Sequence, residues 1–252
     1  MILGAGLGTR LRPITDHTPK ILVPVLGTPM LGRLMAYLAR HGVRDIAMNI
    51  HHLPAQVEAF TTRLADPFDE APPLAPPTLF HEPILLGTGG GIANVATFRG
   101  EESLLVWNGD ILADLPPQRL DEHQTTQGAV GTLAVQDRSG SSKLIVDEDG
   151  WLCGIDSPRR GVHRMVRSPV GRTHPMAFQG ISLLSDQLLK AMPQEGTFDL
   201  IDALLTVVER GLAVNTFDME NDFWGSSGTP EQLEQLEAGL RARPKLLAQW
   251  GF

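Results

Sequence analysis

The amino-acid sequence predicts an α/β fold, in which a mixed, mainly parallel central sheet lies between two layers of helices and a small antiparallel part is added. Two observations predict it. From the first residue, apolar runs typical of buried strands alternate with amphipathic helical patterns, which is the order of βαβ units. In the second half, short strand-like runs follow one another directly, which favours antiparallel pairing. The 252 residues, 42% of them hydrophobic, are enough for one domain.

The first half begins with a short apolar run and a glycine-rich loop, and a helix follows. We expect Thr28 to cap this helix, Pro29 to occupy its first turn and Gly42 to end it. The side chains expected on its buried face are Leu31, Leu34, Met35 and Leu38.

The other elements expected in the first half follow from the same patterns. Strands are expected at 1–3, 45–50, 78–81 and 104–107, helices at 54–64 and from a second glycine-rich segment (87–91) to about Thr97, and a surface loop rich in proline and acidic residues at 66–77.

The second half is expected to contain an antiparallel pair joined by the turn 147–150. Thr197 is expected to cap a helix that Gly211 ends, and Thr229 to open the last helix as part of a capping box, with three leucines on one face. These leucines are Leu233, Leu236 and Leu240, and the strands of this half are expected at 130–135, 143–146, 151–155, 176–184 and 214–217.

Composition and charge exclude several classes of function. The 29 acidic and 21 basic residues give a net charge of −8, so we expect no nucleic-acid partner. No apolar run approaches the roughly 18 residues that cross a membrane, and no basic-then-apolar signal pattern opens the chain, so we expect a cytoplasmic protein without a membrane partner. The one cysteine, Cys153, excludes an internal disulfide and a thiolate zinc cluster. The oligomeric state is left open.

The glycine-rich loop directly after the first strand is the most informative segment. Its glycines, within residues 4–13, let backbone N–H groups approach a phosphate closely. The dinucleotide fingerprint Gly-x-Gly-x-x-Gly fails, because Thr9 or Leu11 stands in its last place, and no Gly-Lys-Ser/Thr of a Walker loop follows. The loop therefore predicts a polyphosphate site, with cations at Arg10, Arg12 and Lys20.

This loop resembles the signature of the sugar-1-phosphate nucleotidyltransferases, Gly-x-Gly-x-Arg-Leu-x-Pro followed by Pro-Lys, which stands here at 6–13 and 19–20. The resemblance continues through Leu-Gly-Thr-Gly-Gly-Gly at 86–91, Asn-Gly-Asp at 108–110 and residues 224–229, and covers nearly the whole chain. The Thr-Gly-Gly-Gly segment and the compact length look most like the N-acetylmuramate-1-phosphate uridylyltransferase and mannose-1-phosphate guanylyltransferase branches.

The resemblance implies a Rossmann-like three-layer αβα sandwich with a small antiparallel subdomain on the substrate side. In one domain, residues 1–128 would bind an NTP, residues 129–228 a sugar 1-phosphate, and residues 229–252 would form a C-terminal helix. The phosphate oxygen of the sugar 1-phosphate would attack the α-phosphorus of the NTP, UTP or GTP being favoured, and pyrophosphate would leave. Mg²⁺ is the implied cofactor.

The resemblance also assigns roles to single residues. Arg10 would hold the β- and γ-phosphates through its planar guanidinium, Lys20 would lie between the α-phosphate and the incoming phosphate, and Asp110 would bind Mg²⁺. Nucleotide binding is implied for Leu3, Gly4, Ala5, Gly6, Gly8, Thr9, Glu82, Gly87, Thr88, Gly89 and Gly90, and sugar-phosphate binding for Asn108, Gly180 and Lys143.

Two positions depart from the family pattern. Ser226 stands where an Asp-x-Gly-Thr motif would supply a second metal-binding aspartate. Asp-Ser-Pro at 156–158 stands where many members have Glu-Lys-Pro, whose lysine grips the sugar phosphate. Lys143 or an arginine of the basic segment 159–174 is left to replace that lysine. This segment is expected to be a solvated excursion or an oligomer contact, or else a hairpin that closes on the sugar phosphate.

Ser226 also keeps a second function open, namely a non-catalytic nucleotide-sugar binding or regulatory protein on the same fold. Arg10 and Lys20 favour catalysis over that alternative, because a sensor of the product does not need a cation at the α-phosphate. A nucleotide-dependent oxidoreductase is disfavoured because its fingerprint fails. A metal site at His51 and His52 is disfavoured too, since adjacent histidines point apart and no third ligand is spaced nearby.

Overall fold

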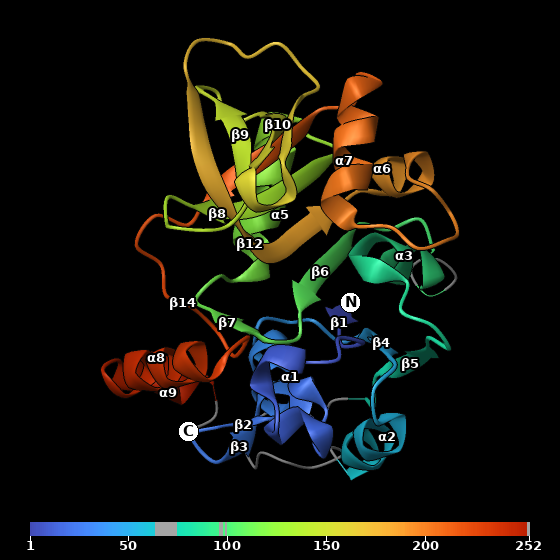
Figure 1. Cartoon of the computed structure of the whole chain (residues 1–252), viewed down its shortest axis with the longest axis vertical. Helices are drawn as coiled ribbons and strands as arrows, with labels where there is room; N and C mark the ends of the chain where they lie inside the picture. Colours follow the sequence, from blue (N-terminus) through green and yellow to red (C-terminus); the bar gives the residue numbers. More distant parts are fainter. Residues whose placement is uncertain (64–74, 96–97, 99, 251–252) are drawn as a thin grey trace. The chain divides into compact units, whose positions relative to one another are not determined.

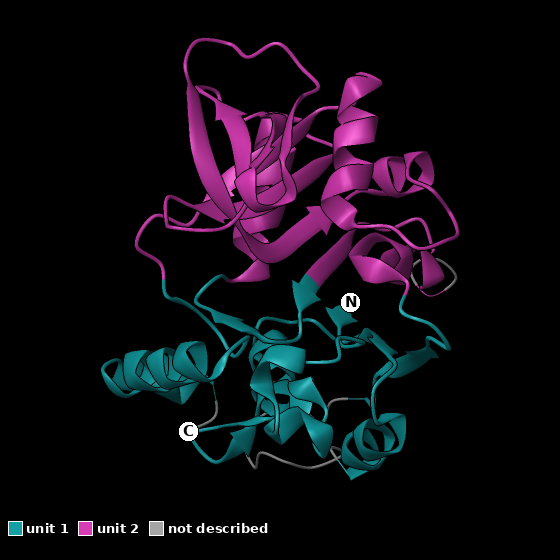
Figure 2. Ribbon diagram, in the orientation of Figure 1, with its two compact units in different colours: residues 1–85, 107–115, 223–252 teal, residues 86–106, 116–222 magenta. Residues whose placement is uncertain are grey.

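The computed structural model describes residues 1–63, 75–95, 98 and 100–250. The chain is divided into two compact units that alternate along the sequence (Figure 2). Unit 1 comprises residues 1–85, 107–115 and 223–252, and unit 2 comprises residues 86–106 and 116–222, so the chain passes between the units four times. The assignment of the nucleotide and of the sugar phosphate to particular stretches of sequence stays a prediction.

The sheet of unit 1 is parallel, as the alternation of strands and helices predicts. Its middle strand, β1, pairs in parallel with β4 and with the end of β6, and β4 pairs in parallel with β5. Helices α1 and α2 follow β1 and β4 along the chain (Figure 1). The bounds are β6 Leu104–Asn108, β1 Ile2–Leu3, β4 Ala47–Ile50, β5 Thr78–His81, α1 Met30–Arg40 and α2 Pro54–Arg63. Residue 64 and positions 66–74 of the predicted loop lie outside the described residues.

Helix α1 begins later than predicted, and Thr28 does not cap it. Pro24–Val25 (β2) and Thr28–Pro29 (β3) form a two-stranded hairpin in which Val25 is the register partner of Thr28. The backbone of Thr28 is thereby held in an extended conformation, and the helix starts at Met30 without a side-chain cap. The buried face is as predicted, because the side chains of Leu31, Leu34, Met35 and Leu38 are all in the core.

The last segment of unit 1 packs helices against this core. Strands β7 (Ile111–Ala113) and β14 (Trp224–Ser226) pair in antiparallel fashion. Helix α8 (Pro230–Arg241) begins at the predicted cap, where the Thr229 hydroxyl accepts a hydrogen bond of 3.3 Å from the backbone N–H of Gln232. Helix α9 (Pro244–Gln249) follows, and the ring of Trp250 stacks on Tyr37 of α1 at 4.0 Å.

Unit 2 contains the antiparallel part that the sequence predicts. Its longest strand, β12, pairs in antiparallel fashion with β8 and β9; β9 pairs with β10 and β10 with β11, whereas β13 runs parallel to β8. The predicted α/β fold with a mixed sheet is thus confirmed. The bounds are β8 Gly131–Gln136, β9 Lys143–Asp147, β10 Leu152–Ser157, β11 Val162–Met165, β12 Thr173–Leu184, β13 Val214–Asp218, α3 Gly87–Asn94, α5 Pro117–Gln127, α6 Asp186–Ala191 and α7 Leu200–Glu209.

The start of α7 differs from the prediction. Asp199, not Thr197, occupies the N-cap position, and its side chain makes no capping bond. The first N–H of the helix, that of Leu200, instead donates to the hydroxyl of Thr88, 112 residues earlier, at 2.8 Å. Gly211 ends this helix with φ +94°, as predicted, whereas the predicted end of the helix at Thr97 lies outside the described residues. Within the described part of the chain, no helix combines the length and apolarity that membrane crossing requires.

Candidate functional site

The glycine-rich loop after β1 folds into three short 3₁₀ turns instead of one open loop. The turns are η1 (Thr9–Leu11), η2 (Ile14–Asp16) and η3 (Lys20–Leu22). Gly8 has φ +64°, and a Cβ there would lie 2.7 Å from the Thr15 side chain, whose hydroxyl donates to the Gly8 carbonyl at 2.8 Å. Glycine is therefore required at position 8 by both conformation and space. Thr15 is a supporting residue that the sequence analysis missed.

A buried polar chain fixes the beginning of this loop to the neighbouring strands. The backbone N–H of Gly4 donates to Asn49 Oδ1 at 2.9 Å, and Asn49 Nδ2 donates to Glu82 Oε1 at 2.7 Å. The Asn49 and Glu82 side chains are almost completely buried. Sequence reasoning also missed Asn49, although an asparagine inside the apolar strand Ala47–Ile50 was a visible signal. The contact of Glu82 with a nucleotide stays a prediction.

The centre of the site is the ion pair of two residues that the sequence predicts. Lys20 Nζ lies 2.5 Å from Asp110 Oδ2, and both side chains are about one-sixth exposed. Lys20 comes from η3 and Asp110 from the turn between β6 and β7, at the carboxyl end of a parallel strand, where α/β sheets place their ligands. The structure therefore brings the predicted catalytic lysine and the predicted metal aspartate into direct contact.

Ser226 also faces Asp110. Its hydroxyl donates to Asp110 Oδ2 at 3.3 Å and accepts a 3.1 Å hydrogen bond from the backbone N–H of Gly228. The backbone N–H of Ser227 donates to the Asp110 carbonyl at 2.9 Å. Ser226, which stands in place of the expected second aspartate, thus lies next to the first predicted metal-binding aspartate, Asp110.

Arg10 lies beside this cluster. A Cβ built on Gly228 would be 3.2 Å from Arg10 Nη2 and 3.2 Å from Ser226 Oγ. Arg10 is exposed, and no carboxylate of the described residues pairs with it. By contrast, Arg12 pairs with Asp16 at 3.1 Å on the surface. Arg10 is therefore a free cation next to the Lys20–Asp110 pair, a suitable place for a phosphate.

The cluster offers oxygen atoms of the kind that Mg²⁺ prefers, but only a few of them. Mg²⁺ takes oxygen ligands and can be held by one or two carboxylates when phosphates supply others. Asp110 offers one carboxylate and Ser226 one hydroxyl oxygen, and the part of the chain that the structure describes contains no group of three or more potential metal ligands among His, Cys, Asp and Glu. His51 and His52 bond the separate carbonyls of Glu82 and Thr15.

Packing explains in part why the second glycine-rich segment, in unit 2, consists of glycines. It forms the start of α3, where the N–H groups of Gly89 and Gly90 both donate to the carbonyl of Phe198, at 2.9 and 3.1 Å. A Cβ on Gly89 would lie 2.4 Å from the Phe198 ring, so no larger residue fits there. With Thr88 capping α7, this segment fastens α3 to α7, and its contact with a nucleotide stays a prediction.

The other predicted sugar-phosphate residues lie in different places. Asn108 ends β6 beside Leu3, whereas Gly180 has φ +73° where the register between β12 and β8 shifts. Lys143 Nζ donates to the carbonyl of Arg138. Ser157, at the position where the resemblance implied a sugar-phosphate lysine, is fully buried with its hydroxyl 2.6 Å from that of Ser142. Which residue replaces that lysine stays open.

Three of the five arginines in the basic segment are paired with acids of unit 2. Arg164 lies 2.7 Å from Glu209, Arg160 lies 3.2 Å from Asp202 and Arg167 lies 3.5 Å from Asp147. Pairing of this kind favours a structural contribution of these three arginines. The closing of the hairpin on a sugar phosphate stays a prediction.

Comparisons with known proteins place the chain in one family. A sequence model of the family described as nucleotidyl transferase matches residues 1–242. A UTP–glucose-1-phosphate uridylyltransferase of Synechocystis sp. is 24% identical over 95% of this chain and 63% of its own length. A mannose-1-phosphate guanylyltransferase of Mycobacterium tuberculosis is 37% identical over 52% of this chain and 35% of its own length. The chain therefore spans less than two thirds of these two relatives.

A third relative has nearly the same length. An N-acetylmuramate alpha-1-phosphate uridylyltransferase of Caulobacter vibrioides is 26% identical over 95% of this chain and 96% of its own length. Among solved structures, a UDP-glucose pyrophosphorylase from Acinetobacter baumanii gives a TM-score of 0.75 at 17% identity, over 97% of this chain and 94% of its own. HddC from Yersinia pseudotuberculosis, complexed with GMP-PN, gives a TM-score of 0.71 at 21% identity, over 94% of this chain and 97% of its own. At these identities the structures show a common fold.

Proposed function

The chain belongs to the nucleotidyl transferase family, and we propose that it transfers a nucleotidyl group from an NTP to a sugar 1-phosphate. The phosphate oxygen of the sugar 1-phosphate attacks the α-phosphorus of the NTP. The bond from that phosphorus to the oxygen that bridges it to the β-phosphorus breaks, and the electron pair leaves with pyrophosphate. The products are an NDP-sugar and pyrophosphate.

The observation that supports this proposal most is the Lys20–Asp110 pair beside Arg10, with which no carboxylate in the described part of the chain pairs. Two polyanions must approach each other, and the in-line transition state spreads negative charge over the equatorial oxygens, so fixed cations supply much of the catalysis. Asp110 holds Lys20 in place, which lowers the cost of ordering its flexible side chain for the reaction. Arg10 supplies a planar donor pair for the β- and γ-phosphates.

Asp110, with the Ser226 hydroxyl beside it, is the residue that would hold Mg²⁺. When bound, Mg²⁺ supplies positive charge that offsets the charge of the phosphates. Lys20 then has both the Asp110 carboxylate and the α-phosphate as partners. Ser226 keeps the Asp110 carboxylate oriented, because the Ser226 hydroxyl donates to Asp110 Oδ2. The hydroxyl is itself held by the hydrogen bond that it accepts from the backbone N–H of Gly228.

We propose UTP or GTP as the nucleotide, because the named relatives include both uridylyltransferases and guanylyltransferases. Pyrophosphate release, measured with each of the four common NTPs against a panel of sugar 1-phosphates, tests the reaction and its specificity together. We expect release that depends on both substrates and on Mg²⁺. The absence of release with every pair would contradict the catalytic proposal.

The single carboxylate at the cluster favours one alternative, a binding or regulatory protein for nucleotide sugars. Such a protein would bind an NDP-sugar without releasing pyrophosphate from any NTP. Calorimetric titration of NDP-sugars alongside the pyrophosphate assay separates the two functions, because only the enzyme combines binding with turnover.

A further inference from the structure

Unit 2 contains a cavity of about 430 Å³ that the candidate site does not use. This volume lies in the range of roughly 300–1,000 Å³ that small-molecule pockets occupy. The cavity lies between the start of β10, the segment after β11 and the C-terminal end of α7. Its lining residues are Trp151, Val166, Arg167, Val208, Gly211, Leu212 and Ala213.

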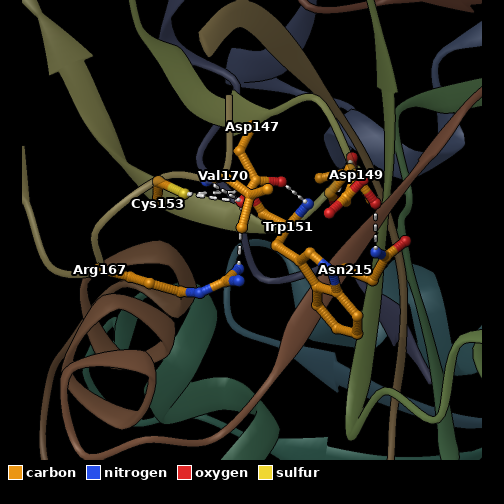
Figure 3. Close-up of polar contacts among 9 residues, drawn as sticks. Asp147, Asp149, Trp151, Cys153, Arg167, Val170 and Asn215 are labelled. Atoms are coloured by element: carbon orange, nitrogen blue, oxygen red, sulfur yellow. Dashed lines mark hydrogen bonds and ion pairs between the residues drawn. The ribbon is translucent and has the colours of Figure 1, made fainter. Parts of the chain in front are cut away.

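One buried carboxylate, that of Asp147, holds both the backbone of Trp151 and the guanidinium of Arg167 (Figure 3). Asp147 accepts hydrogen bonds from the backbone N–H of Trp151 at 2.9 Å and of Val170 at 3.1 Å, and Arg167 Nη1 lies 3.5 Å from Asp147 Oδ2. The guanidinium carbon of Arg167 lies 5.5 Å from the centre of the Trp151 ring. The guanidinium is thus held over the Trp151 ring, so the ring and the positive charge are preorganised next to each other.

Arg167 retains donors that a ligand can use. Its side chain is 33% exposed, and Asp147 is the one carboxylate of the described residues that pairs with it. A guanidinium has five N–H donors in a planar fork that suits carboxylates, sulfonates and phosphates. The segment 158–174, which supplies Val166 and Arg167, contains five arginines and no acidic residue, and acids elsewhere in unit 2 pair with three of the five.

We propose that this cavity binds a small aromatic monoanion. The ring of the ligand packs on Trp151 and on the aliphatic wall of Val208 and Leu212, and its anionic group pairs with Arg167. All of these residues belong to unit 2, whereas the Lys20–Asp110 cluster belongs to unit 1. The proposal therefore does not depend on the nucleotidyl transfer proposed above.

The test uses 8-anilinonaphthalene-1-sulfonate, a fluorescent aromatic monoanion, titrated against the whole chain. We expect saturable binding that Ala213→Trp abolishes, because Ala213 is exposed and lines the cavity, so a large side chain there fills the space without entering the core. Ala55→Trp, an equally large change at an exposed position of α2 in unit 1, is the matched control and should bind as the parent does. Equal binding by Ala213→Trp and the parent would overturn the proposed location.

The charge requirement is tested separately. Arg167→Gln should weaken binding of the sulfonate about tenfold, equivalent to about 1.4 kcal/mol. Arg167→Gln should leave the affinity for the neutral N-phenyl-1-naphthylamine nearly unchanged. The affinity of Arg167→Lys for the sulfonate should lie between those of the parent and of Arg167→Gln. Thermal unfolding of each variant checks that the Asp147 turn is intact. If Arg167→Gln binds the sulfonate as well as the parent does, the cavity is not an anion site and the proposal is wrong.

Discussion

Asp110 accepts hydrogen bonds from Lys20 and from Ser226 through the same oxygen, Oδ2. Its other oxygen has no partner among the described residues and is the atom most available to a metal ion. The sequence predicted both Lys20 and Asp110 through motifs that surround each of them. Their direct contact could not be predicted, because it joins residues 90 positions apart through the packing of η3 against the end of β6.

The first prediction concerns the charge of Lys20. Lys20→Ala should lower kcat of pyrophosphate release by a factor of about 10² to 10³, which is typical when one preorganised donor to the transition state is removed. Arg241→Ala is the control, because Arg241 is an exposed cation of unit 1 that pairs with Glu237 on α8 and has no role in the site, and its kcat should stay near that of the parent. Steady-state kinetics with saturating NTP measure both. A Lys20→Ala variant as active as the parent would refute the role given to Lys20.

The second prediction concerns the missing carboxylate. Ser226→Asp places a second carboxylate beside Asp110 Oδ2. A carboxylate and a cation attract each other by roughly 4 kcal/mol per pair of unit charges about 4 Å apart, at an effective dielectric constant near 20. Dehydration of the metal cancels much of this attraction. We therefore expect Mn²⁺, titrated without nucleotide and followed by electron paramagnetic resonance, to bind about tenfold more tightly than to the parent.

The matched control for that variant is Ser226→Asn, which has a similar shape and no charge and should not bind Mn²⁺ more tightly. The Mg²⁺ concentration that gives half-maximal pyrophosphate release should fall in Ser226→Asp as well. Equal Mn²⁺ affinity in parent and Ser226→Asp would mean that position 226 does not face the metal. Turnover that appears only in Ser226→Asp would favour the binding-protein alternative for the parent.

At the scale of elements, most strands were predictable, whereas two helix starts and the strands β2, β3, β7, β11 and β14 were not. The strand 78–81 was predicted with its observed bounds, because a short apolar run between polar segments has one simple interpretation. The start of α1 was misplaced because a Thr-Pro pair is typical of a helix start, yet here it completes a hairpin with Pro24–Val25. The cap of α7 comes from Thr88, which is distant in sequence, so no local pattern contains it.

The turn that joins β9 to β10 gives the third prediction. Burial of Asp147 raises the pKa of its carboxyl, but the N–H groups of Trp151 and Val170 and the charge of Arg167 outweigh this, so the pKa lies below its ordinary value. A carboxyl with a lowered pKa stabilises the fold above its unfolded-state pKa, and this contribution is lost as the pH falls through the folded-state value. Asp147→Asn should therefore lower the free energy of unfolding by about 2 kcal/mol near neutral pH.

That difference should be smaller at about pH 3 than near neutral pH, because the Asp147 carboxyl is then largely protonated in the unfolded chain and the stabilisation is lost as the pH falls toward the lower pKa of the folded state. Urea unfolding of parent and variant at both pH values measures it. Asp149→Asn, in the same turn but with an exposed side chain, is the control and should change little at either pH. A destabilisation by Asp147→Asn that is independent of pH would show that lost packing, not charge, is responsible.

At the scale of the whole molecule, the sequence predicted the fold class but not the two units. Neither unit is continuous, because residues 107–115 and 223–252 return to unit 1 after the chain has left it. Composition does not change at these crossings, so the sequence carries no boundary signal there. The cavity of unit 2 was equally hidden, because it combines Trp151, Arg167 and Val208, which come from three separate segments of the sequence. Such surfaces are set by tertiary packing, which periodicity does not report.

This interleaving leads to the last prediction. Trp250 is fully buried, stacks on Tyr37 and accepts a hydrogen bond at its carbonyl from the buried Arg33 at 3.3 Å, so it fastens the C-terminal helices to α1. Trp250→Ala should cost about 3–5 kcal/mol through the cavity it leaves. For a chain of this size, 1 kcal/mol corresponds to roughly 2–4 °C, so the melting temperature should fall by about 10 °C.

Because unit 2 is inserted into unit 1 and β6 contributes residues to both, we expect this fall to appear in a single calorimetric transition of the whole chain. Gln249→Ala, at the neighbouring exposed position that ends α9, should leave the melting temperature of that transition unchanged. Two separate transitions in Trp250→Ala, with the lower one shifted and the upper one at the parent temperature, would show that unit 2 stays folded without unit 1 and that the shared strand does not couple them.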